Sequence, residues 1–475
     1  MTMKTVTIKN IYKESLVVNG DKKVRMNVCI STDSKEDVLW YEVDEKYEPY
    51  LCDDRCDGIV VSIFLTAMRF GYEVIKSNYP ISEKLYYNLT YHVIPHFFDI
   101  GKKEGKNYPR LKIEAETTSE KYNGKAVVTG MSRGVDSFTT LYEYKDFELE
   151  DYRITHLCYH NIGAHHGNDT LTGKSKYTSR ELFEGQLQKT KEFCEKYDYE
   201  LVAVDSNLNS ILSDIFGRWY FNRTHTYRNL GTAMILQKLY KRYYYSSAHS
   251  LSNLNKLSVE TDSASYERWV IPYLCTESME FYSTNQEWSR HEKVERIAKM
   301  AESYDYLHVC LVGIKNCGQC LKCMITLMEL DAMGDGVLDR YKNSFDIENY
   351  KQNHRDKWFS QIYELKTGKI GGTTSFGGVF DCALEHNLPL LPEPEPELLY
   401  KEGSKLTTIK NNVNIRAFPN IKAKQIILVQ EGTELDCIGK WERWFKIRME
   451  NGQTGYVFEG SVELTRNWGY DVLKK

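Results

Sequence analysis

The chain has 475 residues, a length that favours about three domains. Its 41% hydrophobic residues can bury substantial cores, and its net charge of −4 gives no chain-wide basic surface for nucleic acid. No apolar run reaches the roughly 18 residues of a membrane helix, and the first ten residues lack the apolar core of a secretion signal. We therefore expect a cytoplasmic protein whose 12 cysteines are packed thiols or metal ligands.

Residues 1–120 are predicted to form a mixed α/β module of unknown role. Val6–Asn10 and Val24–Ser31 alternate as strands do. Ile59–Phe70 has the length and the Ala and Met content of a buried helix. A second helix is expected over Ser82–Val93, where the serine is a suitable N-cap.

From about residue 121 the chain alternates strands and helices, which predicts a parallel sheet with helices on both faces. We expect this domain to span 121–387. The expected strands and helices, in chain order, are Ala126–Thr129, Asp136–Tyr144, Thr155–His160, Arg180–Tyr197, Leu201–Val204, Tyr227–Arg242 and Tyr243–Ser246.

The C-terminal part is predicted to be a small all-β module on a stiff linker. Leu388–Leu398 is rich in Pro and Glu, so residues 388–401 are expected to be extended. Residues 402–475 contain short strands and turns that suit a compact β-domain.

Val127–Ser137 (VVTGMSRGVDS) is the most informative segment, because it predicts a strand, a loop of small residues and a helix start. Backbone N–H groups at a helix N-terminus favour an anion, and Ser132, Gly134 and Ser137 can hold phosphate there. Asp136 is a suitable Mg²⁺ ligand. The Gly-Lys-Ser/Thr end of a Walker A loop is missing. An ordinary strand–turn–helix with polar caps is the alternative.

Four cysteines lie close together near the end of the same domain. Their spacing suits a tetrahedral zinc site, and Gly318 permits the turn between ligands. The fourth cysteine of a bacterial-type iron–sulfur run is absent, although a partial cluster and four reduced thiols stay open as alternatives. The cysteines are Cys310, Cys317, Cys320 and Cys323.

These motifs resemble those of one enzyme family. The loop resembles the SGGxDS signature of PP-loop ATP pyrophosphatases, with Arg133 in place of the first glycine. The cysteine pattern, C-LVGIKN-C-G-Q-C-L-K-C, resembles that of the 7-cyano-7-deazaguanine synthases of the queuosine pathway. Tyr227–Leu230 (YRNL) and Ser289–Val294 (SRHEKV) resemble two further segments of those synthases.

The resemblance implies an adenine nucleotide alpha hydrolase-like fold and an ATP-dependent C–N ligase that releases pyrophosphate. It implies ATP, Mg²⁺ and Zn²⁺ as cofactors and a catalytic set of Asp136, Ser137 and Arg133. The implied ATP-binding residues are Ser132, Gly134, Asp136, Ser137, Arg228, Asn229 and Arg290.

The implied substrate is a 7-deazaguanine-type base or a protein conjugated to one. However, the Tyr-Pro-Asp-Cys-Arg substrate segment of the synthases is missing between Ser246 and Glu280. Relatives of these synthases with extra domains occur in anti-phage defence loci. The N- and C-terminal additions of this chain are consistent with that group. His160, His165 and His166 follow a predicted strand and are candidates for the nucleotide pocket or for a general base, or they belong to a polar loop without chemistry.

The last module resembles bacterial SH3 (SH3b) domains. Val413–Arg416, Gly432–Leu435, Trp444–Ile447 and Gly455–Val457 follow that family's pattern in order. Such domains bind peptides or cell-wall glycans, and for a cytoplasmic enzyme we expect a protein contact.

Two other functions stay open. The chain could be a catalytically altered nucleotide-binding scaffold with an SH3b arm, which Arg133 favours. It could also be a tRNA-modifying PP-loop enzyme, with Cys158 as the sulfur carrier. We expect neither a membrane nor nucleic acid as the main partner, and the oligomeric state stays open, with a homodimer among the alternatives.

Overall fold

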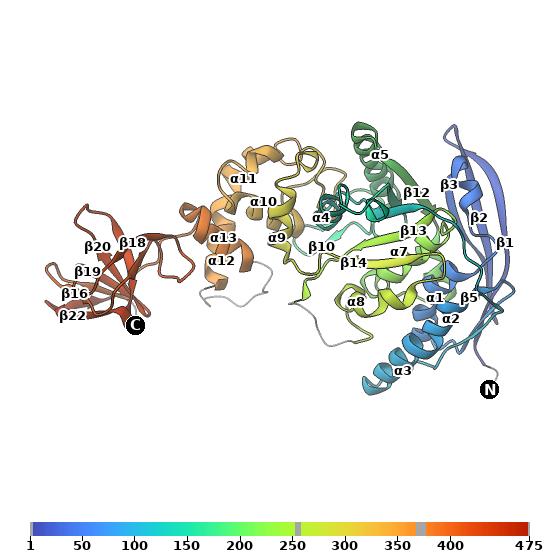
Figure 1. Cartoon of the computed structure of the whole chain (residues 1–475), viewed down its shortest axis with the longest axis horizontal. Helices are drawn as coiled ribbons and strands as arrows, with labels where there is room; N and C mark the ends of the chain where they lie inside the picture. The colour runs from blue at the N-terminus through green and yellow to red at the C-terminus, as the bar shows by residue number, and fades with distance from the viewer. Residues whose placement is uncertain (1–2, 252–257, 367–376, 474–475) are drawn as a thin grey trace. The chain divides into compact units, whose positions relative to one another are not determined.

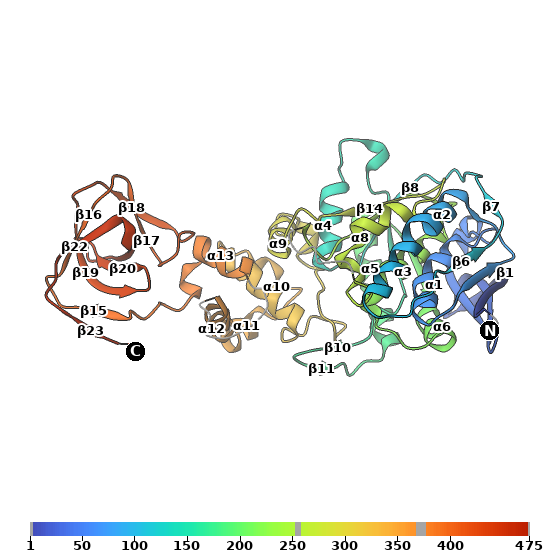
Figure 2. The same cartoon turned by 90° about the horizontal axis from the view of Figure 1, so that it is seen from below.

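The computed structural model describes residues 3–251, 258–366 and 377–473. The chain forms two compact units. The first comprises Met1–Cys323 and Asn343–Phe345, and the second comprises Met324–Lys342 and Asp346–Lys475. The first unit is built around one large sheet, whereas the second contains helices followed by a strand-rich module (Figures 1 and 2).

In the described residues the first unit has a ten-stranded sheet of order β14-β13-β8-β9-β12-β3-β2-β1-β4-β6. Neighbours from β14 to β12 pair in parallel, β12 through β1 pair antiparallel, and β4 and β6 run parallel to β1. The strands are β1 (Thr5–Val18), β2 (Asp21–Thr32), β3 (Glu36–Asp44), β4 (Val74–Ser77), β6 (Lys112–Glu114), β8 (Ala126–Gly130), β9 (His156–His160), β12 (Glu200–Ser206), β13 (Tyr240–Ser246) and β14 (Glu280–Thr284).

Helices connect the parallel strands and cover the sheet. Helices α4 and α5 lie on one side of these strands, and α7, with α1 against it, lies on the other (Figure 1). The helices are α1 (Asp57–Arg69), α2 (Glu83–Asn88), α3 (Ile94–Lys103), α4 (Val135–Tyr144), α5 (Ser179–Tyr197), α6 (Leu208–Ile215), α7 (His225–Met234), α8 (Glu267–Val270) and α9 (Arg290–Ile297).

Local sequence explains several of these elements. Thr178 and Glu181 form a capping box that starts α5, and Ser289 and Glu292 form another at α9. A Cβ atom on Gly231 would lie 2.2 Å from the Ser62 Oγ, so a glycine is needed where α7 crosses α1.

Two expectations differ from the structure. The helix expected over Tyr227–Arg242 ends at Met234, and the tyrosine-rich segment from Tyr240 joins β13 instead. Tertiary pairing with β8 overrides the helix propensity of Lys241 and Arg242. Residues 1–120, expected as a module of their own, contribute β1–β3 to the same sheet as β8–β14.

In its described residues the second unit holds most of α10, three further α-helices and the β-module. Arg355 forms a two-pronged ion pair with the buried Asp331, at 2.8 and 3.0 Å, and the Tyr350 hydroxyl donates to the same carboxylate. These contacts join α10 (Leu321–Ala332), α11 (Ile347–Asn353) and α12 (Arg355–Lys366), which precede α13 (Gly377–His386).

The β-module is antiparallel and has its own core of nine residues, among them Ile415, Ile447 and Val457. Leu398–Tyr400 (β15) pairs with two of its strands, so the end of the expected linker belongs to this sheet. The other strands are β16 (Lys405–Thr408), β17 (Val413–Arg416), β18 (Gln425–Val429), β19 (Glu434–Trp441), β20 (Trp444–Arg448), β21 (Thr454–Phe458), β22 (Val462–Arg466) and β23 (Tyr470–Val472).

Candidate functional site

A cavity of about 300 Å³ opens at the carboxyl ends of β8, β9 and β13. From β8 the chain moves to β9 on one side, whereas β13 lies on its other side, so strand order reverses here. Open α/β sheets bind ligands at such a switch point. The lining residues used below are Asp136, Cys158, His160, His225, Asn229 and Tyr245.

The segment expected to bind phosphate lies at this edge. β8 ends at Gly130, and α4 begins at Val135. The N-cap residue of α4 is Gly134, which has no side chain to cap the first turn, so the N-terminal N–H groups of the helix are left for another acceptor. The Ser132 and Ser137 hydroxyls are 3.3 Å apart, and Ser137 also donates to the Gly134 carbonyl at 3.0 Å. Two hydroxyls and a helix N-terminus are thus brought together in a form that suits an anion.

Asp136 points from α4 toward three cationic side chains. The Nζ of Lys293, which is 1% exposed, lies 3.0 Å from its Oδ1 and 2.6 Å from the Ser247 carbonyl. Burial alone raises the pKa of Asp136, but the charges of Lys293, Arg290 and Lys322 outweigh it and hold the pKa below its usual value. Asp136 therefore stays ionised at neutral pH, as a cation ligand must.

A second cavity, of about 260 Å³, shares Ser132 and Asp136 with the first. Arg290 and Lys322 line it, as do the helix start at Gly134 and the Cys310 segment. Two cationic side chains beside a helix N-terminus make this cavity suited to a polyanion such as pyrophosphate.

Arg133, expected in the catalytic set, turns away from both cavities and is absent from their linings. Its guanidinium donates to Thr190 Oγ1 at 3.2 Å, to the Tyr306 carbonyl at 3.3 Å and to Gln186 Oε1. Its backbone has φ +60°, the left-handed conformation that glycine adopts most easily. The geometry gives Arg133 a bracing contact with α5 in place of the expected contact with phosphate.

The side chains of Arg228 and Asn229, both expected near ATP, lie in two different places. Arg228, expected near ATP, donates to the Ile162 carbonyl at 3.2 Å and to Asn209 Oδ1 at 2.7 Å, outside the cavity lining. Asn229 lines the first cavity, where its Oδ1 lies 2.7 Å from His160 Nδ1. Arg228 thus braces the loop after β9, while Asn229 faces the site.

Of the three clustered histidines, two line the first cavity. Burial lowers the pKa of His160 to about 4, and burial followed by the nearby His166 lowers that of His165 to about 4. His160 is 9% exposed, and its Nε2 has no hydrogen-bond partner among the described residues. Both imidazoles are neutral at pH 7 and suit hydrogen bonding to an uncharged ligand. His166 does not line this cavity.

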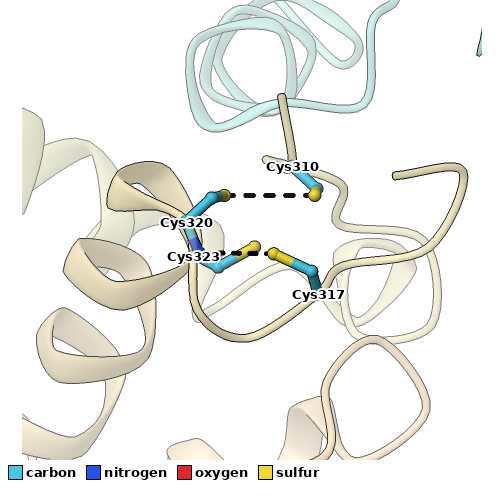
Figure 3. A group of neighbouring side chains, drawn as sticks. All are labelled: Cys310, Cys317, Cys320 and Cys323. Carbon is cyan, nitrogen blue, oxygen red and sulfur yellow. Dashed lines mark hydrogen bonds between the residues drawn. The ribbon is translucent and has the colours of Figure 1, made fainter. Parts of the chain in front are cut away.

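The four cysteines meet at one point, as expected from their spacing (Figure 3). Their sulfur atoms lie within 4.8 Å of one another, and those of Cys310 and Cys320 are 3.9 Å apart. Tetrahedral zinc with four thiolates requires S···S distances of about 3.8 Å. Cys317 Sγ accepts N–H bonds from Gln319 and Cys320 around Gly318, which has φ +72°. The cluster fits a single metal ion.

Asn316, next to Cys317, connects the segment that carries Cys317 with the segment that carries Cys310. Its Oδ1 accepts from the N–H groups of Val309 and Cys310, and its Nδ2 donates to the carbonyls of Leu307 and Ser344. The segment before Cys310 also contacts the loop Ser132–Ser137, because the His308 N–H donates to the Arg133 carbonyl at 2.8 Å. The cysteine cluster and the loop Ser132–Ser137 are therefore parts of one connected structure.

Three site residues were not predicted from the sequence. Lys293 lies in the SRHEKV segment but has no role assigned from the sequence, and its position four residues before the buried Ile297 places it on the buried face of α9. His225 lies outside every motif, and Lys322 lies within the cysteine motif without being one of its ligands. Only the packing of distant segments brings these two side chains to the cavities.

Residues 411–463 match the bacterial SH3 domain family. This match confirms the expected SH3 domain in the C-terminal β-module, where Trp444 is buried at 8% exposure. No curated protein matches the chain. Among the described helices, none combines the length and the apolar character needed to cross a membrane.

Proposed function

We propose that the first unit is an ATP-dependent ligase of the PP-loop type, with an adenine nucleotide alpha hydrolase-like fold. It activates a carboxylate or carbonyl oxygen by adenylylation, releases pyrophosphate and then joins the activated carbon to nitrogen. The substrate is a 7-deazaguanine-type acid or a protein that carries one. A part in defence against phage is consistent with the added domains.

One arrangement carries the proposal: the loop Ser132–Ser137 lies at the switch point of parallel strands, with Asp136 ionised beside three cations. The strand order β12-β9-β8-β13-β14 supports a nucleotide site at this edge. Adenylylation needs a pocket for the nucleoside and an adjoining one for the departing pyrophosphate. The two cavities that share Ser132 and Asp136 supply such a pair.

The chain's residues would divide the work as follows. Ser132, Ser137 and the α4 N-terminus hold the β- and γ-phosphates, and Arg290 and Lys322 neutralise charge as pyrophosphate leaves. Asp136 would hold Mg²⁺, which supplies charge neutralisation on the phosphates when bound. Lys293 keeps Asp136 ionised and oriented.

The cysteine cluster would hold Zn²⁺ and stabilise the fold. Burial raises the pKa of Cys158 to about 12, so this thiol is a poor sulfur carrier, which disfavours the tRNA-thiolating alternative. The SH3 domain is proposed to contact a protein, because members of that family commonly mediate protein or cell-wall interactions.

The test is pyrophosphate release from Mg-ATP with and without 7-carboxy-7-deazaguanine and related acids. We expect acid-dependent release from the wild type and none from Asp136→Ala. Asp146→Ala, an exposed position shortly after the same helix, is the matched control and should behave as the wild type. Equal release from wild type and buffer with every acid would reject the ligase.

A nucleotide-binding scaffold is the second candidate. It is favoured by Arg133, whose side chain leaves the phosphate site. A scaffold would bind Mg-ATP, measured by calorimetry, without releasing pyrophosphate in the same assay.

A further inference from the structure

Three side chains outside every predicted motif form a hydrogen-bonded chain that ends in the first cavity. The Nε2 of His225, at the start of α7, lies 2.8 Å from Asp262 Oδ1. Its Nδ1 lies 2.9 Å from the hydroxyl of Tyr245, near the end of β13. His225 and Tyr245 both line the cavity, whereas Asp262 does not. A carboxylate, an imidazole and a phenol thus run in series from the protein to the site.

The charge of Asp262 fixes where the protons lie. Burial raises the pKa of its carboxyl, but the hydrogen bond and charge of His225 and the Ala264 N–H outweigh burial and lower it. An ionised carboxylate only accepts hydrogen bonds, so neutral His225 carries its proton on Nε2. Its Nδ1 is then the acceptor, and Tyr245 donates to it. The Tyr245 oxygen keeps a lone pair for a donor in the cavity.

The surroundings hold this chain in place. The Tyr245 hydroxyl also lies 3.2 Å from the buried Thr226 Oγ1, which donates to Ser263 Oγ at 2.9 Å. Tyr245 is 6% exposed, so water has little access to its ring. A preorganised, partly dry chain of this kind favours proton transfer at a fixed place.

Other groups on the cavity wall are poorly suited to accept a proton at neutral pH. Asp136 is committed to Lys293, and its pKa is low. His160 and His165 have pKa values of about 4, and Cys158 holds its proton up to about pH 12. His225 differs from them in geometry, because its Nε2 is hydrogen-bonded to the carboxylate of Asp262 while its Nδ1 faces Tyr245.

We propose that Tyr245, His225 and Asp262 are the proton relay for the bond-forming step of the ligase. This inference rests on the proposed function. As the nitrogen nucleophile attacks the adenylylated carbon, the C–N bond forms and the bond from carbon to the AMP oxygen breaks. AMP leaves with that electron pair. The nitrogen's proton goes to the Tyr245 oxygen, while the Tyr245 hydroxyl proton passes to His225 Nδ1. Asp262 positions the imidazole and stabilises its charge.

The experiment separates the two half-reactions by rapid quench, with Mg-ATP, 7-carboxy-7-deazaguanine and ammonium as probes. For Tyr245→Phe we expect the pyrophosphate burst within about twofold of wild type and AMP release slower by ~100-fold, the usual effect of losing a general base. Asp262→Asn should slow the same step. Tyr244→Phe is the matched control, since this neighbour on β13 faces away and donates to the Tyr152 carbonyl.

Two readouts distinguish proton transfer from a structural role. AMP release by the wild type should slow in D₂O, and this isotope effect should vanish in Tyr245→Phe. ¹⁵N spectra of the wild type should show His225 protonated on Nε2, and Asp262→Asn should change that signal, whether or not a substrate is turned over.

Each outcome decides the matter. If the wild type releases no pyrophosphate with the probe acid, both the proposed function and the relay are rejected. If the wild type turns over and Tyr245→Phe releases AMP at the same rate, the proton relay is rejected and the proposed function stands. Equal loss of pyrophosphate and AMP in both variants, with unchanged circular dichroism, would make these residues binding groups and also overturn the relay.

Discussion

The side chain of Arg133 allows the sharpest test of how the loop Ser132–Ser137 is built. We consider Arg133→Gly, which introduces the glycine that the PP-loop signature has at this point. Glycine relieves a left-handed backbone that costs about 1–2 kcal/mol in other residues. Against this, the variant loses three hydrogen bonds from a buried guanidinium, each contributing about 1.5–3 kcal/mol because the donor is charged.

The balance predicts that Arg133→Gly lowers the free energy of unfolding by about 2–4 kcal/mol, given that not all three bonds contribute fully. Burial lowers the pKa of Arg133 to about 10, so the side chain is still charged at pH 7 and its loss leaves Gln186 Oε1 without this donor. Urea unfolding at constant slope measures the change.

Affinity for Mg-ATP, measured by calorimetry well below the unfolding midpoint, is expected to change less than threefold in Arg133→Gly. Arg290→Gln is the contrasting variant, because Arg290 lines the second cavity. It should weaken binding about tenfold, as loss of one charged contact does, with little change in unfolding. If Arg133→Gly were as stable as the wild type yet bound Mg-ATP tenfold more weakly, Arg133 would be a phosphate ligand and the reasoning here would be refuted.

Three further predictions concern charge and metal. The pKa of Asp136 is lowered in the fold, so its ion pair stabilises the protein above about pH 4 and this stabilisation is lost as pH falls through the folded pKa. In Asp136→Asn the free energy of unfolding should therefore depend less on pH in the acid range. An unchanged pH dependence would contradict the pairing. Burial raises the pKa of Glu267 from 4.5 to about 7, so the folded state binds an extra proton and the free energy of unfolding falls as pH rises between these values. Glu267→Gln should therefore raise the free energy of unfolding by up to about 3 kcal/mol at pH 8 and by almost nothing at pH 4. The control Glu287→Gln, at an exposed position, should raise it at neither pH. Purified protein should contain about one zinc per chain. Chelation or Cys317→Ser should remove the metal and lower the melting temperature, whereas the control Cys29→Ser should keep the metal. A metal-free protein of unchanged melting temperature would exclude a structural metal.

Sequence reasoning succeeded where the signal is local. The strand, loop and helix around Ser132–Ser137 and the meeting of the four cysteines depend on residues close in the chain. The SH3 domain likewise follows from short motifs in order. The bond-forming chemistry assigned to these parts is still a proposal.

Sequence reasoning failed where partners are distant. The direction of Arg133 depends on its φ angle and on acceptors at 186, 190 and 306. Lys293 becomes buried only when α9 packs against α4. The junction between β3 and β12 was missed because it joins residues more than 160 positions apart.

The pairing of β12 with β3 also has a consequence for the evolution and handling of this chain. A five-stranded parallel sheet that ended at β12 would leave an open row of N–H and C=O groups, which invites another chain to add itself. Here Asp205 and Ser206, at the end of β12, are matched to Glu42 and Tyr41, so the N-terminal strands cover that end of the margin. A truncated protein that begins near residue 120 should therefore self-associate, and any shorter relative must shield this margin by other means.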